Sequence, residues 1–511
     1  MIKFEHIRKC ALFTGAFFLS GILFSQKNIL ELLPGSEKIY YDKKSGLHRL
    51  VGSVSFNYQG NTMFCDSAHY REKNKIVRAY GKVQIRKGDI NLFCDSLYYN
   101  GSLKYAKLWG HVRVRDSEYK ITTDSLDYDA KNGKAIYRRN GTIESIVSDE
   151  KITSRTGYFY PNKGSFFFSG NVNYKKEKLA ITTDTLQFSY EKQTSYFYGP
   201  TKIINDTVTI LCKKGWYNSE KKEGVLYKQA EIIQKSSLIR GDTLYYNGAK
   251  QAYEGKGNVF YKDYDQNLVF QGNRGYSSNE KHYAYLTGKA LAFKVKDKDT
   301  IFIHADTLHL IKDTLNRTQE IKGNRNVMIY NKSIQCIADS GYYLPNEDML
   351  FLRSKPIVWA QNTELKGTKM DIFLKDTLVD KILISGNSNA IMEVDSGNFY
   401  NQIAGKEIVA LFENNELVRT DVQGNAHTIY FPEETSKSDS IFEKKRIGMN
   451  RVIASDLRIY LDSGEVKGIT YFDKPDGIFY PMDQINPEEQ FINGFILYPA
   501  LRPKSPLDLI K

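Results

Sequence analysis

Apolar and polar residues alternate along short stretches that recur through most of the chain. Residues 82–86 (KVQIR) and 111–115 (HVRVR) each place apolar side chains on one side and charged or polar side chains on the other. A period of two residues is the pattern of a β-strand with one buried face. Gly-containing pairs such as Asn132-Gly133 mark bends between such stretches. Because no long stretch after residue 25 shows helical periodicity, the sequence predicts an all-β protein.

A first marker recurs at a fixed interval. It is a small residue followed by Asp and by Ser or Thr, as in CDSL at 94–97 and TDSL at 123–126. Its second residue lies at positions 66, 95, 124, 155, 184, 213 and 242, so successive copies are 29 or 31 residues apart. Arg155 and Lys213 replace the Asp in two copies without breaking the period.

A second marker, Gly usually followed by a polar residue and Val, lies about half a period away. Its Gly occupies positions 52, 81, 110, 141, 170 and 199, again 29 or 31 residues apart. Self-similarity at such a period indicates stacked supersecondary units, each of which buries its apolar face only against its neighbours. The sequence therefore predicts an elongated stack of repeats of about 29–33 residues, each with two strands and two bends.

The first 25 residues are typical of a secretory signal. Three basic residues precede an apolar run of 15 residues, Cys10 to Phe24, which is short for a membrane span. We predict cleavage after Ser25, with an uncleaved anchor as the open alternative. Either way the protein is exported, and the periplasm is the predicted compartment, with association with the outer membrane left open.

The remaining chain is divided by its strand pattern. We predict a first set of repeats at 26–200, a second at 201–362, and a third with longer strands at 363–511. The third contains a charged insert at 432–446, predicted to be a loop, and a Pro-containing tail from Pro475 predicted to be a terminal cap.

Composition adds a preference for acidic partners. The net charge is +13 and falls to +11 without residues 1–25, which carry three Lys or Arg and one Glu. A basic exported protein favours phosphorylated lipid, acidic polysaccharide or a membrane surface, although a basic charge spread over the whole surface explains the same number. The 36 Tyr and 28 Phe beside only 12 Pro favour strands over disordered linkers.

Nothing in the sequence indicates catalysis. The recurring Asp occurs in most repeats, whereas an active site occurs once, and Asp before Ser or Thr commonly shapes a bend by bonding its own backbone. The sequence has no GxSxG, HExxH or P-loop motif. His304 and His309 flank Asp306, but this spacing on a strand does not converge on a metal. We predict no enzyme activity, catalytic residue, metal or cofactor, and the export signal argues against nucleic acid.

Cys65 and Cys94 occupy equivalent positions one period apart. Parallel stacking of the repeats would bring them within disulfide reach. The same position holds Thr123, Thr183 or Gly241 in other copies, so it is interpreted as a position for small residues.

The repeated unit, as in Gly110-His111-Val112 through Tyr128, resembles the OstA-like family over roughly residues 38–430. The resemblance implies an open, V-shaped β-jelly roll whose interior holds acyl chains. The family includes periplasmic bridge proteins of lipopolysaccharide transport and the N-terminal domain of the outer-membrane translocon. Their domains stack end to end, and the family has no catalytic residues. This chain is much longer than the single-domain bridge proteins.

We therefore predict a periplasmic bridge or chaperone that binds lipopolysaccharide or a similar glycolipid. Its predicted protein partners are other OstA-like domains, or a second copy, added through edge strands. The alternatives are a structural β-solenoid or surface adhesin without lipid, and a polysaccharide-cleaving β-helix enzyme. Predicted groove residues are Val83, Ile85, Val112, Val114 and Val172. Predicted phosphate-contacting residues at the groove rim are Lys82, Arg86, Arg113 and Arg115.

Overall fold

The structure is a computed structural model, and the signal segment with Cys10 lies outside its described residues. The described residues are 31–58, 61–129, 131–160, 165–189, 191–218, 220–295, 300–375, 378–414, 416–438 and 441–511. They divide into two compact units, the first reaching Lys235 and including Arg240–Ala249, and the second formed by Ser236–Ile239 and Lys250–Lys511. The three-part division of the repeats stays a prediction.

Both units consist of antiparallel strands, which confirms the predicted all-β fold. The helices among the described residues are short 3₁₀ turns, one at Asp395–Gly397 and four after Pro481. None of these described helices is long and apolar enough to cross a membrane.

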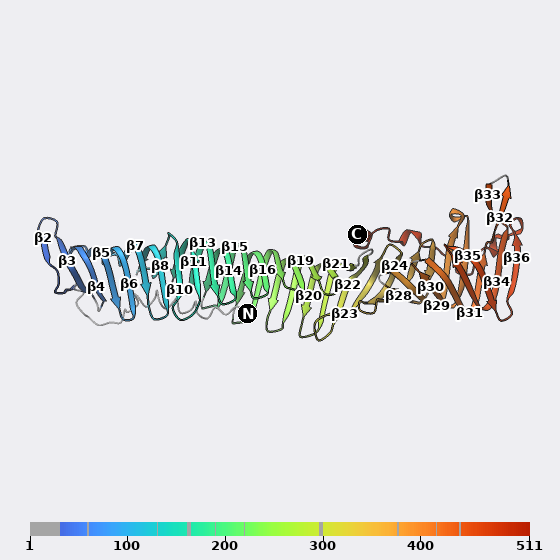
Figure 1. The fold of residues 1–511 in the computed structure, drawn as a ribbon, viewed down its shortest axis with the longest axis horizontal. Coiled ribbons are helices and arrows are strands. Elements are labelled where there is room, and N and C mark those ends of the chain that lie inside the picture. Colours follow the sequence, from blue (N-terminus) through green and yellow to red (C-terminus); the bar gives the residue numbers. More distant parts are fainter. Residues whose placement is uncertain are drawn as a thin grey trace. The chain divides into compact units, whose positions relative to one another are not determined.

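In the first unit each long strand pairs with the strand before it and the strand after it, as the row from β2 to β16 in Figure 1 shows. Its strands are β1 Glu31–Leu32, β2 Lys38–Asp42, β3 Leu47–Tyr58, β4 Asn61–Arg71, β5 Ile76–Lys87, β6 Ile90–Asn100, β7 Tyr105–Arg115, β8 Tyr119–Asp129, β9 Lys134–Tyr137, β10 Gly141–Ser145, β11 Lys151–Ser154, β12 Thr156–Tyr160, β13 Ser165–Lys176, β14 Leu179–Ser189, β15 Thr194–Asn205, β16 Val208–Asn218 and β17 Glu223–Ile233. Strand β18, Ser237–Asn247, has residues in both units.

The second unit continues the same antiparallel pattern with strands that lengthen toward the C-terminus. They are β19 Ala252–Asp263, β20 Leu268–Ser278, β21 Tyr283–Val295, β22 Thr300–Lys312, β23 Thr318–Tyr330, β24 Ile334–Leu344, β25 Met349–Arg353, β26 Ile357–Ala360, β27 Thr363–Lys366, β28 Lys369–Lys375, β29 Leu378–Val394, β30 Phe399–Glu413, β31 Glu416–Tyr430, β32 Glu433–Ser438, β33 Ile441–Arg446, β34 Gly448–Asp462, β35 Glu465–Phe472 and β36 Asp476–Pro481.

Long strands bend at the second marker. In β5, Gly81 and Lys82 both have positive φ, +73° and +46°, and the pairing register shifts between Tyr80 and Val83. Buried side chains lie on both sides of this bend, Ala79 before it and Val83 after it. The bend therefore lets both halves of one strand face the same interior.

The two sequence markers contact each other at this bend. A Cβ built on Gly110 would lie 2.7 Å from the Cβ of Asp95 on the neighbouring strand, and one on Gly199 would lie 2.7 Å from that of Asp184. Only glycine combines the left-handed backbone with this close approach. Arg155 packs in the same way against Gly170, which explains why a change of charge at this position leaves the repeat intact.

Turns one period apart are joined by backbone hydrogen bonds. The Gly101 N–H donates to the Lys75 carbonyl at 2.9 Å, and the Gly248 N–H donates to the Lys222 carbonyl at 2.7 Å. These bonds fix the hairpins that they join at the spacing that the sequence repeats.

The idea that Cys65 and Cys94 stack in parallel is wrong. Strands β4 and β6 both pair antiparallel with β5, which lies between them. Strands two rungs apart are separated by about 9.6 Å, beyond disulfide reach. The four cysteines of the described residues are free and buried, and burial raises the pKa of both Cys65 and Cys94 to about 12.

The charged insert is a hairpin rather than the predicted loop. Strands β32 and β33 pair antiparallel. Arg446 at its base bonds Asp395 at 2.7 Å and Glu433 at 2.6 Å. The charge of Arg446 therefore attaches the hairpin to the 3₁₀ turn at Asp395–Gly397, which precedes β30.

The C-terminal tail, residues 487–511, crosses the strands of the second unit and is called the strap below. Buried polar side chains on three strands hold it. Gln402 donates to the Gln490 carbonyl at 2.8 Å and accepts from the Ile492 N–H at 2.9 Å. Further along, Glu364 accepts from the Tyr498 N–H at 3.0 Å, and Gln335 accepts from Arg502 at 2.7 Å.

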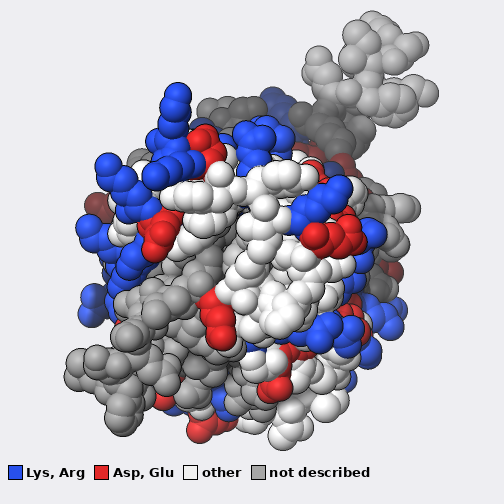
Figure 2. All heavy atoms as spheres, turned by 90° about the vertical axis from the view of Figure 1, so that its left-hand side faces the viewer, with Lys and Arg blue, Asp and Glu red and all other residues white. Residues whose placement is uncertain are grey.

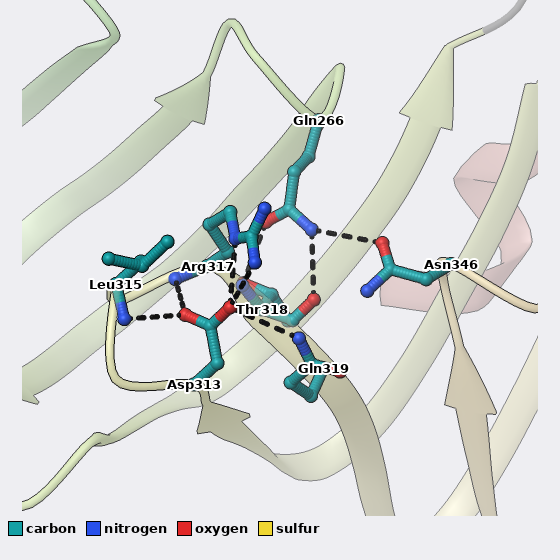
Figure 3. Close-up of polar contacts among 7 residues, drawn as sticks. All are labelled: Gln266, Asp313, Leu315, Arg317, Thr318, Gln319 and Asn346. Carbon is teal, nitrogen blue, oxygen red and sulfur yellow. Dashed lines mark hydrogen bonds and ion pairs between the residues drawn. The ribbon is translucent and has the colours of Figure 1, made fainter.

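A second glutamine of this unit, Gln266, also donates one hydrogen bond to the backbone and accepts another from it, as Figure 3 shows. Gln266 donates to the Thr318 carbonyl at 2.9 Å and accepts from the Thr318 N–H at 2.7 Å. The primary amide thereby reproduces the hydrogen bonds of a neighbouring strand. Asp313 closes the adjacent turn by accepting from the N–H groups of Leu315 and Arg317.

Replacing Gly110 by Ala should destabilise the first unit more than replacing Gly88 by Ala. Both glycines have positive φ, but a Cβ at Gly88 meets nothing within 4 Å. We expect Gly88→Ala to cost about 1–2 kcal/mol from backbone strain and Gly110→Ala a further ~1–3 kcal/mol from overpacking against Asp95. Urea unfolding followed by circular dichroism measures both. Equal losses would show that the bend tolerates a side chain.

Candidate functional site

The predicted groove residues of the first unit face its interior. Val83, Val112 and Val172 are fully buried, Val114 is 7% exposed, and Ile85 packs partly buried against the same core. The neighbouring Arg113 and Arg115 alternate with these valines and are exposed, as the period of two requires.

Large side chains fill this interior. The Phe159 ring lies 5.8 Å from that of Phe166 and 5.9 Å from that of Phe168, centroid to centroid. The hydroxyl of Tyr137 bonds that of Ser154 at 2.6 Å, and the Tyr174 hydroxyl donates to Glu150 at 3.1 Å. Lipid contact by the predicted groove residues stays a prediction.

The predicted phosphate-contacting residues lie on the outer side of the first unit. Arg86 is placed over the ring of Phe64, with its guanidinium carbon 5.7 Å from the ring centroid. Lys82 occupies the bend after Gly81 and is exposed. A phosphate bound by these side chains would be separated from the interior by the thickness of the sheet.

An apolar cleft lies in the second unit, between the two halves of its long strands. Strand β30 lines it with Ile403 before its bend and with Ala410 and Phe412 after it. The free volume is about 70 Å³. The lining residues are Ala360, Gln361, Thr363, Leu365, Ala390, Met392, Asn401, Gln402, Ile403, Ile408, Ala410, Phe412, Leu417, Thr420, Thr428, Ile429, Tyr430, Ile459, Leu461, Gly464, Val466 and Ile469.

Small inward residues on long strands explain the cleft. The buried positions Ala390 and Ala410 hold methyl groups where the first unit holds rings such as those of Phe166 and Phe188. Strands β29 and β30 are 17 and 15 residues long, against 11 or 12 for most long strands of the first unit. Longer strands with smaller inward side chains enclose more space than they fill.

Sequence reasoning missed these residues because it searched the most regular repeats. The signal was present in the longer apolar runs after residue 363 and in their inward alanines. Regularly spaced repeats mark the part of the chain where side chains pack uniformly. A cleft forms where longer strands and smaller inward side chains interrupt this packing.

The lining of the cleft is uncharged and mostly apolar. None of its lining residues is charged. Burial raises the pKa of the Tyr430 hydroxyl, so this group stays neutral at physiological pH. Such a surface accepts hydrocarbon and offers hydrogen bonds from a few amides and hydroxyls at its margin.

The histidines singled out in the sequence have ordinary partners. His304 contacts the Ala290 carbonyl at 2.8 Å through Nδ1, and His309 contacts the Tyr283 hydroxyl at 2.6 Å. Within the described part of the chain, no three His, Cys, Asp or Glu side chains are grouped so as to hold a metal ion.

The fold defines a β-repeat protein whose second unit contains an apolar cleft. Residues 26–184 and 167–242 match the family model described as OstA-like protein. This match confirms, for residues 26–242, the resemblance to the OstA-like family seen in the repeats. No curated protein matches the chain.

Among solved structures, the crystal structure of LptH from Pseudomonas aeruginosa is similar to part of this chain. LptH is described as the LptA-homologous periplasmic component of the conserved lipopolysaccharide transport device. The sequence identity is 15%, the match covers 22% of this chain and 83% of LptH, and the TM-score is 0.20.

Enlarging an inward alanine should cost less stability in the cleft than in the filled core. Ala390 lines the cleft, whereas Ala79 lies fully buried in the core of the first unit. We expect Ala79→Leu to cost about 1–3 kcal/mol by overpacking and Ala390→Leu to be nearly neutral. Thermal and urea unfolding of each variant measures this difference. A larger loss for Ala390→Leu would mean that the cleft is not available space.

Proposed function

We propose that this protein is a periplasmic carrier in the transport of lipopolysaccharide or a similar glycolipid, and that the cleft of its second unit holds acyl chains. The observation that supports this most is the uncharged, apolar lining contributed by both halves of β30 and β31. The OstA-like match over residues 26–242 supports the transport role, because members of this family act in lipopolysaccharide transport.

The energetics favour hydrocarbon as the ligand. Each buried CH₂ group contributes about 0.8 kcal/mol, so an acyl chain that enters even partly gains several kcal/mol. The two halves that face the cleft belong to the same bent strands, so widening it changes the bends and leaves the ladders between strands intact. Passing lipid onward makes and breaks no covalent bond, so the protein needs no catalytic group.

End-to-end association with another OstA-like domain or a second copy is part of this proposal. Strand β2 pairs with β3 and with no other described strand, and all five of its residues are exposed. Ile39, Tyr40 and Tyr41 are between 55% and 59% exposed. Figure 2 looks onto this end, where uncharged residues with a few Asp and Glu form the middle of the face and Lys and Arg gather toward its margins. An exposed edge strand can add a partner's strand.

A structural β-solenoid without a lipid ligand is the second candidate. The filled aromatic interior of the first unit favours it for that part of the chain. The lipid carrier predicts that lipid enters the cleft of the second unit, and the structural solenoid predicts that it does not.

Photo-cross-linking in living cells distinguishes them. A photo-reactive side chain at Ala410, which lines the cleft, should cross-link to lipopolysaccharide. The same group at Val409 is the matched control, because this neighbour lies on the opposite face of β30 and is only partly buried. We expect a strong adduct from position 410 and little or none from 409.

A second arm uses Val112 and Arg113 of the first unit in the same way. An adduct from Val112 would extend the lipid path to the predicted groove residues. Equal labelling from 409 and 410, or none from either while the protein remains folded, would exclude the lipid-carrier proposal and leave the structural solenoid.

A further inference from the structure

The strap of the second unit lies along one line of directly opposed residues. Gln335 pairs with Trp359, Trp359 with Glu364, Glu364 with Ile391, and Ile391 with Gln402. All five are at most 5% exposed. Their neighbours along each strand, such as Cys336 and Ala390, are buried on the core side. The strap therefore covers the outer face of the sheet along this line, called the outer row below.

The first unit has an outer row at the same repeat position. Gln335 lies four residues before Asp339 of the first marker, and Asn91, Lys120 and Lys151 lie four residues before the corresponding residues of their copies. Strand pairing places these residues and those of the intervening strands directly opposite one another, so that they form one continuous row. From β5 to β13 the row is Arg86, Asn91, Arg115, Lys120, Glu144, Lys151 and Lys175, and it is flanked by the uncharged Thr62 and Ala180.

This row of the first unit is cationic and accessible. Five of its seven residues are Lys or Arg, and Arg86, Arg115, Lys151 and Lys175 are exposed or nearly so. Arg115, Lys120 and Lys175 form no ion pair with a described residue. Neighbouring rungs are about 4.8 Å apart, so the row extends about 29 Å across the strands.

A carboxylate already occupies one place in the row. Glu144 accepts from the Lys151 ammonium at 2.7 Å. This hydrogen bond, with the charges of Lys151 and Lys120, lowers the pKa of the Glu144 carboxyl despite partial desolvation. The row is therefore built to hold carboxylates beside its cations.

We propose that the outer row of the first unit is a docking track for an extended acidic segment of a partner polypeptide. The segment lies across the strands, as the strap does on the equivalent row of the second unit. The two rows differ in chemistry, amides and one carboxylate under the strap against cations here, so they select different occupants. This inference goes beyond lipid carriage, because it concerns the outer face and requires no ligand in the interior.

A peptide fits better than an anionic membrane. An anionic membrane surface would engage every exposed cation on this half of the strands, including Arg113, which lies two residues from the row on β7. A single extended chain would engage only the row. At about 3.3 Å per residue, some nine residues span it.

The test measures binding of a fluorescein-labelled peptide of alternating Glu and Ser, about twelve residues long, by fluorescence anisotropy. The protein is the full chain from Gln26. The row variant is Arg115→Gln with Lys120→Gln, and the matched control is Arg78→Gln with Lys107→Gln, which removes the same charge. We expect the row variant to weaken binding by about tenfold and the control by less than about twofold. A Gln-Ser peptide should not bind.

Two results would overturn the proposal. One is equal weakening in both variants or no binding by the natural chain, which leaves only general electrostatics. The other is row-dependent binding to phosphatidylglycerol vesicles without binding of the peptide, which assigns the row to a membrane. Unchanged thermal unfolding of both variants excludes misfolding, and neither result bears on acyl chains in the cleft.

Discussion

The close contact between a left-handed glycine at a strand bend and the side chain opposite it, an aspartate in several repeats, is the constraint on which the first unit depends. The left-handed backbone of residues such as Gly110 turns the strand, and the Asp95 side chain takes the space that a Cβ would occupy. Both halves of the bent strand then face one interior. The inward side chains of a single strand therefore line both sides of the core, and no second segment of chain is needed to cover it. The ladder and the turn-to-turn hydrogen bonds repeat this arrangement at a fixed interval.

Much of this could be predicted from the sequence because period-two alternation and two interleaved markers report local geometry. The direction of the strands could not be predicted, since the same 29-residue spacing fits parallel coils and antiparallel hairpins. That ambiguity produced the wrong stacking of Cys65 and Cys94. The charged insert was missed for a different reason: its two strands pair only with each other, and their charged composition is also that of a loop.

The size of the inward side chains decides whether the interior of each unit is filled or contains a cleft. Phenylalanine and tyrosine at inward positions of the first unit leave side chains touching, whereas alanines on the longer strands of the second unit leave a cleft. The same backbone plan thus supports a filled core in one unit and an apolar cleft in the other. The sequence patterns that reveal the plan are insensitive to this difference, because Ala and Phe are both apolar in an alternation.

The turn-to-turn hydrogen bonds have a consequence for how such a chain changes length. Several hairpins of the first unit are bonded to the hairpin one repeat earlier, as Gly101 is to Lys75 and Asp206 is to Lys178. Deleting or duplicating one whole repeat therefore rejoins surfaces that already fit, while deleting half a repeat does not. Each added repeat extends the ladder by about 9.6 Å. The length of this unit can therefore change during evolution only in steps of one whole repeat.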